Sequence, residues 1–145
     1  QTANYQAVST GTTDHAEVIR VAYDPSRISY EKLLEVFFTV AHDPTQLNRQ
    51  GPDRGRQYRS AVFYADESQR QAAERYIRQL EASDRFSDPI VTTLEPLRGY
   101  YPAESYHQDF VQKNPTHGYI VQQALPKVRK LYDKFGDAVK QPAEN

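Results

Sequence analysis

Residues 60–69 read Ser60-Ala61-Val62-Phe63-Tyr64-Ala65-Asp66-Glu67-Ser68-Gln69 and pass directly from a strand pattern to a helix pattern. The apolar and aromatic run at 60–64 is typical of a strand. Asp66 and Gln69 have the spacing of a capping box, which satisfies backbone N–H groups at the start of a helix. The helix that follows has an apolar face, made of Ala72, Ala73, Tyr76, Ile77 and Leu80. This stretch therefore predicts a strand and a helix that share one core.

Further strands and helices are predicted on both sides of this stretch. The runs 18–23 and 90–94 are rich in β-branched residues, so each predicts a strand, and the first is expected to be buried. Ser29 is a candidate N-cap for a helix that ends before His42-Asp43-Pro44, because proline disfavours helical geometry in the residue before it. Residues 104–113 and 124–135 predict two more helices. The combination predicts an α+β fold, with a mixed sheet packed against helices in a two-layer sandwich.

Length and composition predict a single globular domain. The 145 residues fit one domain over 1–140, with a flexible tail at 141–145. The 18 Lys and Arg residues nearly balance the 19 Asp and Glu residues, which argues against a nucleic-acid or anionic membrane partner. No run approaches the ~20 apolar residues of a membrane span, and the first residues lack a signal-peptide pattern. We therefore expect a monomer, with the cytoplasm as the favoured location.

The chain contains no cysteine, which excludes disulfides and cysteine catalysis within these residues. The four histidines lack the spacing of a metal site, so we predict no metal. His107 remains open to three interpretations: a metal ligand, a proton carrier or a buried structural histidine. The sequence also lacks a glycine-rich phosphate loop and a Gly-x-Ser-x-Gly elbow, so it supports neither a nucleotide-binding nor a hydrolase function.

Glu17 is a candidate proton donor. It immediately precedes the apolar run at 18–23 and lies near His15, so partial burial is expected. Burial raises the pKa of a carboxyl group, as a proton donor near neutral pH requires. The alternative is a solvated glutamate at a strand end.

Tyr5, Tyr58 and Asp53 are candidate binding residues. The two tyrosines lie outside the predicted core periodicity, and each offers an apolar ring with one hydrogen-bond donor. Together they are suited to hold a polarised S–O oxygen while their rings face a methyl group, although tyrosines are more often half-buried packing residues. Asp53 lies in the aperiodic segment 42–57, where it either orients neighbouring donors or caps a turn.

Three motifs resemble those of the A-type peptide-methionine sulfoxide reductases, in the same order. They read Asp14-His15-Ala16-Glu17, Gln50-Gly51-Pro52-Asp53-Arg54-Gly55-Arg56-Gln57-Tyr58-Arg59-Ser60 and Tyr101-Pro102-Ala103-Glu104-Ser105-Tyr106-His107-Gln108-Asp109-Phe110. The resemblance extends from Tyr5 to Tyr119 and implies the fold of that family. The family's Gly-Cys-Phe-Trp-Gly motif has no counterpart in this chain, so we expect the first strand and helix of the fold to be missing.

The resemblance implies a role for each candidate residue. Glu17 matches the glutamate that protonates the sulfoxide oxygen, Tyr5 and Tyr58 match the tyrosines that hold it, and Asp53 matches an aspartate of the intervening loop. In the implied mechanism a cysteine thiolate attacks the sulfur of methionine-S-sulfoxide, methionine is released, and a sulfenic acid remains on the cysteine. The substrate would be free or within oxidised proteins. No bound cofactor is implied, and thioredoxin or another thiol would be the external reductant.

Departures from the family pattern leave two alternatives to a complete reductase. Without the nucleophile, the chain is expected to be inactive alone. It would then be a non-catalytic module that binds methionine sulfoxide, or a fragment completed by another chain that carries the cysteine segment. The family's resolving cysteine is replaced in Gly118-Tyr119-Ile120, and Asp14 stands where the family often has glycine.

Overall fold

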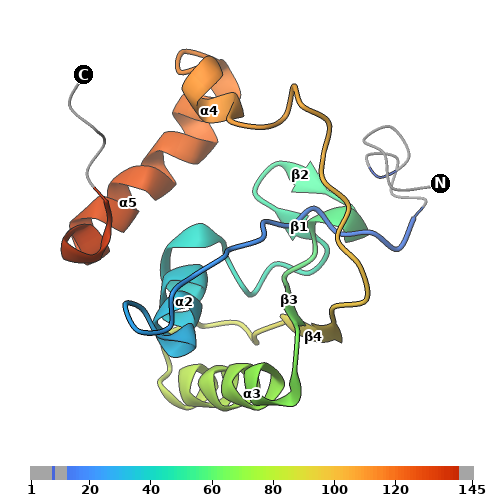
Figure 1. Cartoon of the computed structure of the whole chain (residues 1–145), viewed down its shortest axis with the longest axis vertical. Helices are drawn as coiled ribbons and strands as arrows, with labels where there is room; N and C mark the ends of the chain where they lie inside the picture. The colour runs from blue at the N-terminus through green and yellow to red at the C-terminus, as the bar shows by residue number, and fades with distance from the viewer. Residues whose placement is uncertain (1–7, 9–12, 141–145) are drawn as a thin grey trace. The chain divides into compact units, whose positions relative to one another are not determined.

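The computed structural model describes residues 8 and 13–140, and the chain falls into two compact units divided after Ser105 (Figure 1). The first unit contains α2 (Tyr30–Val36), the π-helix η1 (Phe37–Ala41), β1 (Arg49–Gln50), β2 (Asp53–Arg54), the 3₁₀ helix η2 (Arg56–Tyr58), β3 (Ala61–Tyr64), α3 (Glu67–Ala82) and β4 (Thr93–Pro96). The second contains α4 (Phe110–Lys113), the π-helix η3 (Ile120–Ala124), α5 (Leu125–Phe135) and the 3₁₀ helix η4 (Gly136–Ala138). The predicted α+β class is confirmed. The predicted tail lies outside the described residues.

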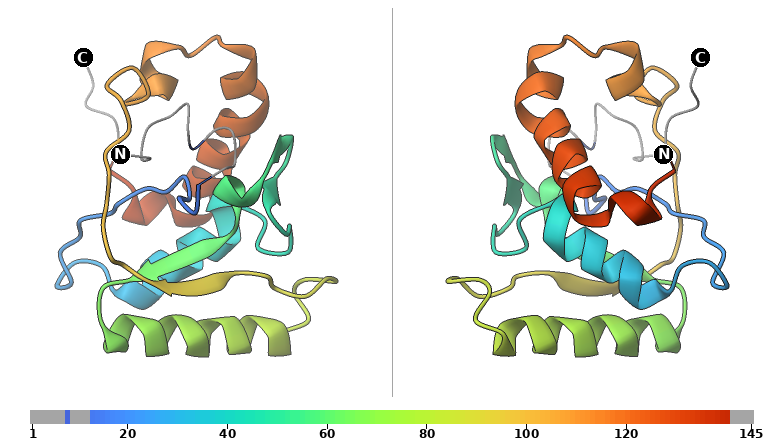
Figure 2. Two further views of the ribbon diagram at one scale, coloured as in Figure 1. Left: turned by 90° about the vertical axis from the view of Figure 1, so that its right-hand side faces the viewer. Right: turned by 90° about the vertical axis from the view of Figure 1, so that its left-hand side faces the viewer.

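The core of the first unit lies between helices α2 and α3 and the strand pair β3–β4. The two strands are parallel, in a register that pairs Ala61 with Thr93 and Tyr64 with Pro96. Helix α3 packs along this pair and also contacts α2 (Figures 1 and 2). The buried cluster consists of Leu34, Phe38, Ala73 and Leu80, against which Val62 and Leu94 pack from the strands. The strand predicted at 60–64 is confirmed, and the one predicted at 90–94 begins three residues later, at Thr93.

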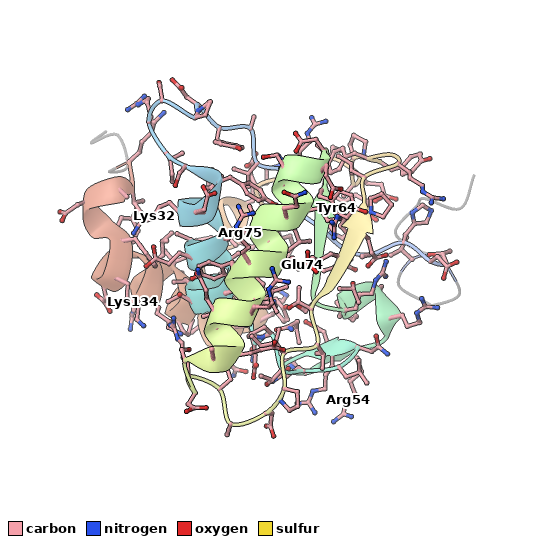
Figure 3. The ribbon with its side chains drawn as sticks, turned by 90° about the horizontal axis from the view of Figure 1, so that it is seen from below. Lys32, Arg54, Tyr64, Glu74, Arg75 and Lys134 are labelled. Carbon is pink, nitrogen blue, oxygen red and sulfur yellow. The ribbon has the colours of Figure 1, made fainter. Side chains whose placement is uncertain are left out.

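Helix α3 begins as the sequence predicts. The Asp66 carboxylate accepts a hydrogen bond from the Gln69 N–H at 2.9 Å, and the Gln69 side chain accepts one from the Ala65 N–H at 2.8 Å. Ala73, on the predicted apolar face, is fully buried, whereas the opposite face carries charged pairs such as Arg70 with Glu67. Figure 3 shows this helix in the foreground. Local capping and helical periodicity therefore position the helix that supports the strand pair.

Replacing the capping carboxylate should measurably weaken the first unit. Asp66→Ala removes one acceptor for the orphan N–H groups of the first turn and is expected to cost about 1 kcal/mol of unfolding free energy. Ser68→Ala, an exposed position two residues further along in the same first turn, is the matched control and should stay within about 0.5 kcal/mol of the parent. Urea unfolding followed by circular dichroism measures both. Equal midpoints for the two variants would contradict the capping role.

Helix α2 also follows its sequence signals. Ser29 Oγ accepts a hydrogen bond from the Lys32 N–H at 3.1 Å, which confirms the predicted N-cap of α2. The helical chain continues through η1 to Ala41 and stops before His42-Asp43-Pro44, as predicted. His42 is already extended, with a φ of −158°. This abrupt end directs the chain from the core toward the segment that contains Asp53 and Tyr58.

Two predictions of secondary structure are wrong. Residues 18–23 are extended, but they form no strand with any described residue and are largely exposed, with 82% of Ile19 accessible to solvent. An apolar β-rich run needs a partner strand to be buried, and no described residue supplies one. The helix predicted at 104–113 is limited to Phe110–Lys113, preceded by turns. Asp109 adopts left-handed geometry, with a φ of 56°, which a helix cannot continue through.

The second unit is helical where the structure describes it. Helix α5 begins at Leu125 and ends at Phe135, which confirms the helix predicted over 124–135. Pro126 lies in its first turn, where the missing N–H would have no helical partner in any case. Among the described residues, no helix is long and apolar enough to cross a bilayer.

Candidate functional site

The segment 42–57 is held in a defined conformation by side-chain hydrogen bonds. Strands β1 and β2 form a two-stranded antiparallel hairpin, in which Gln50 pairs with Asp53. Gly51, in the turn, has a φ of 55°, the sign that two-residue hairpin turns require. The Gln50 side chain accepts from the Asp43 N–H at 3.1 Å and donates to the Asp43 carbonyl at 2.9 Å. The segment predicted as an aperiodic loop is therefore a braced hairpin that carries Asp53.

Gly55 connects this hairpin to the short helix that carries Tyr58. Its φ is 132°, and its N–H donates to the Asn48 carbonyl at 2.9 Å. A Cβ at this position would lie 2.1 Å from Oε1 of Gln57, whose side chain is buried. The backbone geometry favours glycine, because side chains rarely adopt this φ, and the Gln57 side chain would also have to move to admit a Cβ. The path of the chain from Asp53 to Tyr58 therefore depends on Gly55.

Gly55→Ala should destabilise the protein and displace the Tyr58 segment. Strained backbone geometry costs about 1–3 kcal/mol, and the contact with Gln57 adds to this cost. Gly136→Ala is the matched control, because a Cβ at Gly136 meets nothing within 4 Å and its φ is −54°. Thermal unfolding of both variants tests this expectation. A Gly55→Ala variant as stable as Gly136→Ala would show that the segment adapts without strain.

The backbone brings Glu17 beside the Tyr58 segment. The Glu17 N–H donates to the Gln57 carbonyl at 2.9 Å, so Glu17 lies against the residue that precedes Tyr58. The Tyr58 side chain is half-buried, whereas that of Glu17 is exposed. The expected partial burial of Glu17 is wrong, because the run that follows it at 18–23 is itself exposed. Tyr5 lies outside the described residues.

Arg59 joins the first and second motifs. Its Nε and Nη2 atoms each lie 3.0 Å from one carboxylate oxygen of Glu95, in a bidentate pair. Nη2 also donates to the Asp14 carbonyl at 3.2 Å, and Nη1 donates to the Arg56 carbonyl at 3.1 Å. Only 10% of the Arg59 side chain is accessible to solvent. We call this group of contacts, from Arg59 to Glu95, Asp14 and Arg56, the Arg59 clamp.

The clamp also changes the acid chemistry of Glu95. Hydrogen bonds from Arg59 are the main reason that the pKa of the Glu95 carboxyl lies below its ordinary value, with a further contribution from the Thr93 hydroxyl. Neither partner of this ion pair was predicted from the sequence. The position of Arg59 next to Tyr58, within the second motif, was the one available signal.

The third motif contacts the first through aromatic rings. The ring of His15 meets that of Tyr101 edge-on, with centroids 5.4 Å apart. The neighbouring Tyr100 ring lies 4.5 Å beneath the guanidinium of Arg20. The first motif, around His15, therefore contacts residues of the second and third motifs. His107 belongs to the second unit, where its ring lies 4.2 Å from that of Tyr106.

The family model and the similar proteins carry the same family name. The family model described as peptide methionine sulfoxide reductase matches residues 1–139. A protein of Synechocystis named peptide methionine sulfoxide reductase MsrA 2 is 54% identical over 96% of this chain and 65% of its own length. A protein of the same name from Mesorhizobium japonicum is 53% identical over 92% of this chain and 68% of its own length. The chain thus spans about two thirds of the length of these relatives.

Solved structures show the same similarity in three dimensions. The reduced form of Mxr1 from Saccharomyces cerevisiae is 38% identical, with a TM-score of 0.73 over 78% of this chain and 61% of that one. Methionine sulfoxide reductase A of Corynebacterium diphtheriae is 36% identical, with a TM-score of 0.63 over 77% of this chain and 57% of that one.

Proposed function

The chain belongs to the peptide methionine sulfoxide reductase family, and on that premise we propose that its site serves the reduction of methionine-S-sulfoxide by a cysteine thiolate from outside these 145 residues. The observation that carries the proposal is the convergence of the three motifs. The segment 14–17 contacts Gln57 and Arg59 of the second motif and Tyr101 of the third.

In this proposal each residue acts on the sulfoxide oxygen. The thiolate attacks the sulfur, Glu17 gives a proton to the oxygen, and the oxygen passes to the cysteine as a sulfenic acid while methionine leaves. Tyr58, with Tyr5, donates hydrogen bonds to the oxygen, and Asp53 orients these donors. An external dithiol, such as that of thioredoxin, then reduces the sulfenic acid, which yields water and a disulfide. We also propose that the substrate is free or peptide-bound and that the protein acts as a monomer.

A second candidate function is that of a fragment completed by a separate chain that carries the cysteine. The segment 18–23 favours this function. Its backbone has no hydrogen-bonded partner among the described residues, and Val18, Ile19 and Val21 are 46%, 82% and 51% exposed. An exposed apolar extended segment of this kind is suited to pair with an added strand. In this candidate function, the added strand would bring the thiolate to the site.

One experiment tests both functions. The full chain is assayed alone, fused to an N-terminal segment with the family's Gly-Cys-Phe-Trp-Gly motif, and mixed with that segment as a separate peptide. Dithiothreitol is the reductant, and the substrates are the two epimers of N-acetylmethionine sulfoxide. We expect N-acetylmethionine to form from the S epimer alone, and only where the cysteine is present. The same fusion with serine in place of cysteine is the control. A fusion that turns over neither epimer would overturn the reductase proposal, and an inactive mixture would overturn the fragment function.

A further inference from the structure

Three hydrogen-bonded polar side chains connect the end of η1 to the start of β3: His42 and Thr92, which are half-buried, and Ser60, which is buried. Nε2 of His42 lies 2.6 Å from the Ser60 hydroxyl, and that hydroxyl lies 2.6 Å from the hydroxyl of Thr92. Nδ1 of His42 lies 3.1 Å from the carbonyl of Phe37. Ser60 is only 4% exposed. No sequence motif predicts these contacts. We call them, from the Phe37 carbonyl through His42 and Ser60 to Thr92, the His42 relay.

The chemistry of the groups gives the relay a direction. The Phe37 carbonyl can only accept, so Nδ1 of His42 must carry the proton. In a neutral imidazole, Nε2 is then an acceptor, and it accepts a hydrogen bond from the Ser60 hydroxyl. The Ser60 oxygen in turn accepts from Thr92. Each step satisfies one donor and one acceptor, as buried polar groups require.

The relay ends next to the proposed site. Ser60 follows Tyr58 and Arg59 directly, and its carbonyl accepts from the Thr93 N–H at 3.0 Å, which fixes it to the neighbouring strand. The Arg59 clamp holds one side of this junction, and the His42 relay holds the other. The His42 ring is itself fixed, because it stacks on Phe37 with centroids 4.0 Å apart. A displacement of the His42 ring would therefore move Ser60 and, with it, the segment that carries Tyr58.

We propose that His42 is a positioning residue that, through Ser60, sets the orientation of Tyr58 toward the sulfoxide oxygen. This proposal rests on the proposed function only for the role of Tyr58. The competing explanation is that the relay satisfies buried polar groups and has no influence on the site.

The first arm of the test does not depend on the function. Nitrogen-15 NMR of the full chain with labelled histidine reports which ring nitrogen of His42 is protonated. We expect a protonated Nδ1 and an unprotonated Nε2 at neutral pH. A protonated Nε2 would reverse the direction of the relay and overturn the proposal. In a second sample with carbon-13-labelled tyrosine, Ser60→Ala should shift the ring signals of Tyr58. Unmoved Tyr58 signals would also overturn it.

The second arm measures affinity for N-acetylmethionine-S-sulfoxide by titration calorimetry. His42→Ala and Ser60→Ala should each weaken binding about tenfold, the scale of one lost hydrogen bond. In a Tyr58→Phe background the same changes should have almost no effect, and His42→Gln, which keeps a donor and an acceptor, should restore part of the affinity. Ser83→Ala is the matched control, because the Ser83 hydroxyl donates at 2.7 Å to the Leu80 carbonyl at the end of α3.

The outcomes separate the two proposals. Equal losses in the parent and Tyr58→Phe backgrounds would mean a purely structural role and would overturn the positioning proposal. A parent chain that does not bind the sulfoxide would count against the proposed function, and the NMR arm would still decide the inference about His42. Unfolding curves of each variant establish that folding is retained before binding is compared.

Discussion

Glu17→Gln in the chain fused to the Gly-Cys-Phe-Trp-Gly segment is expected to lower kcat about 10²- to 10⁴-fold, the contribution of a positioned proton donor. The sulfoxide oxygen gains negative charge as the thiolate attacks, so it needs a proton before the bond to sulfur breaks. Glutamine has the same shape and can donate a hydrogen bond, but it cannot deliver a proton. The hydrogen bond from the Glu17 N–H to the Gln57 carbonyl belongs to the backbone and is retained in the variant.

The matched control for this variant is Glu81→Gln, an exposed carboxylate in the last turn of α3. It changes the net charge by the same amount and should leave kcat unchanged. Stopped-time assays of methionine formation at saturating substrate give kcat directly. A Glu17→Gln enzyme with parental kcat would mean that water or another residue protonates the oxygen, and the assigned role of Glu17 would be wrong.

The elements that the sequence predicts well are those whose signals lie within a few residues. The Asp66–Gln69 cap and the Ser29 cap both operate over three residues. The stop before Pro44 depends on the residue directly before the proline. Because each of these signals involves only neighbours along the chain, sequence spacing is enough to read them.

The wrong predictions concern features that depend on partners far away in the sequence. Residues 18–23 have strand-forming composition, but composition does not show which strand would pair with them. The burial predicted for Glu17 was wrong for the same reason, because it depended on the burial of residues 18–23. At Asp109 the chain enters left-handed geometry, which aspartate tolerates better than most residues and which the helical pattern does not reveal.

At the candidate site, too, the sequence indicates individual residues but not the long-range contacts between them. Glu17, Tyr58 and Asp53 were candidates from their residue types and positions, the family resemblance gave each a role, and these catalytic roles stay predictions. The contacts that bring their segments together were not predicted. Arg59 reaches Glu95 across 36 positions and Asp14 across 45. Such contacts depend on the folded path of the chain, which no local motif encodes.

Breaking the Arg59 clamp should have the largest effect on stability. Arg59→Met keeps the apolar part of the side chain but removes every donor to Glu95, Asp14 and Arg56. Loss of one partner from a buried ion pair costs about 3–5 kcal/mol, and the lower end applies here because 32% of the Glu95 side chain reaches solvent. Arg70→Met, which removes exposed pairs along α3, should cost no more than about 1 kcal/mol. Urea unfolding at neutral pH compares the two.

The pH dependence of unfolding tests the same contact independently. Because Arg59 lowers the pKa of Glu95 in the folded state, the ionised pair stabilises the fold at pH values above the ordinary glutamate pKa. That stability is lost as the pH falls through the lowered pKa of the folded protein. Arg59→Met should therefore show a shallower loss of stability in acid than the parent, and adding Glu95→Gln should recover part of the neutral-pH stability, because no carboxylate is then left without its partner. Parallel acid profiles for parent and variant would show that the Arg59 clamp is not what lowers the pKa of Glu95.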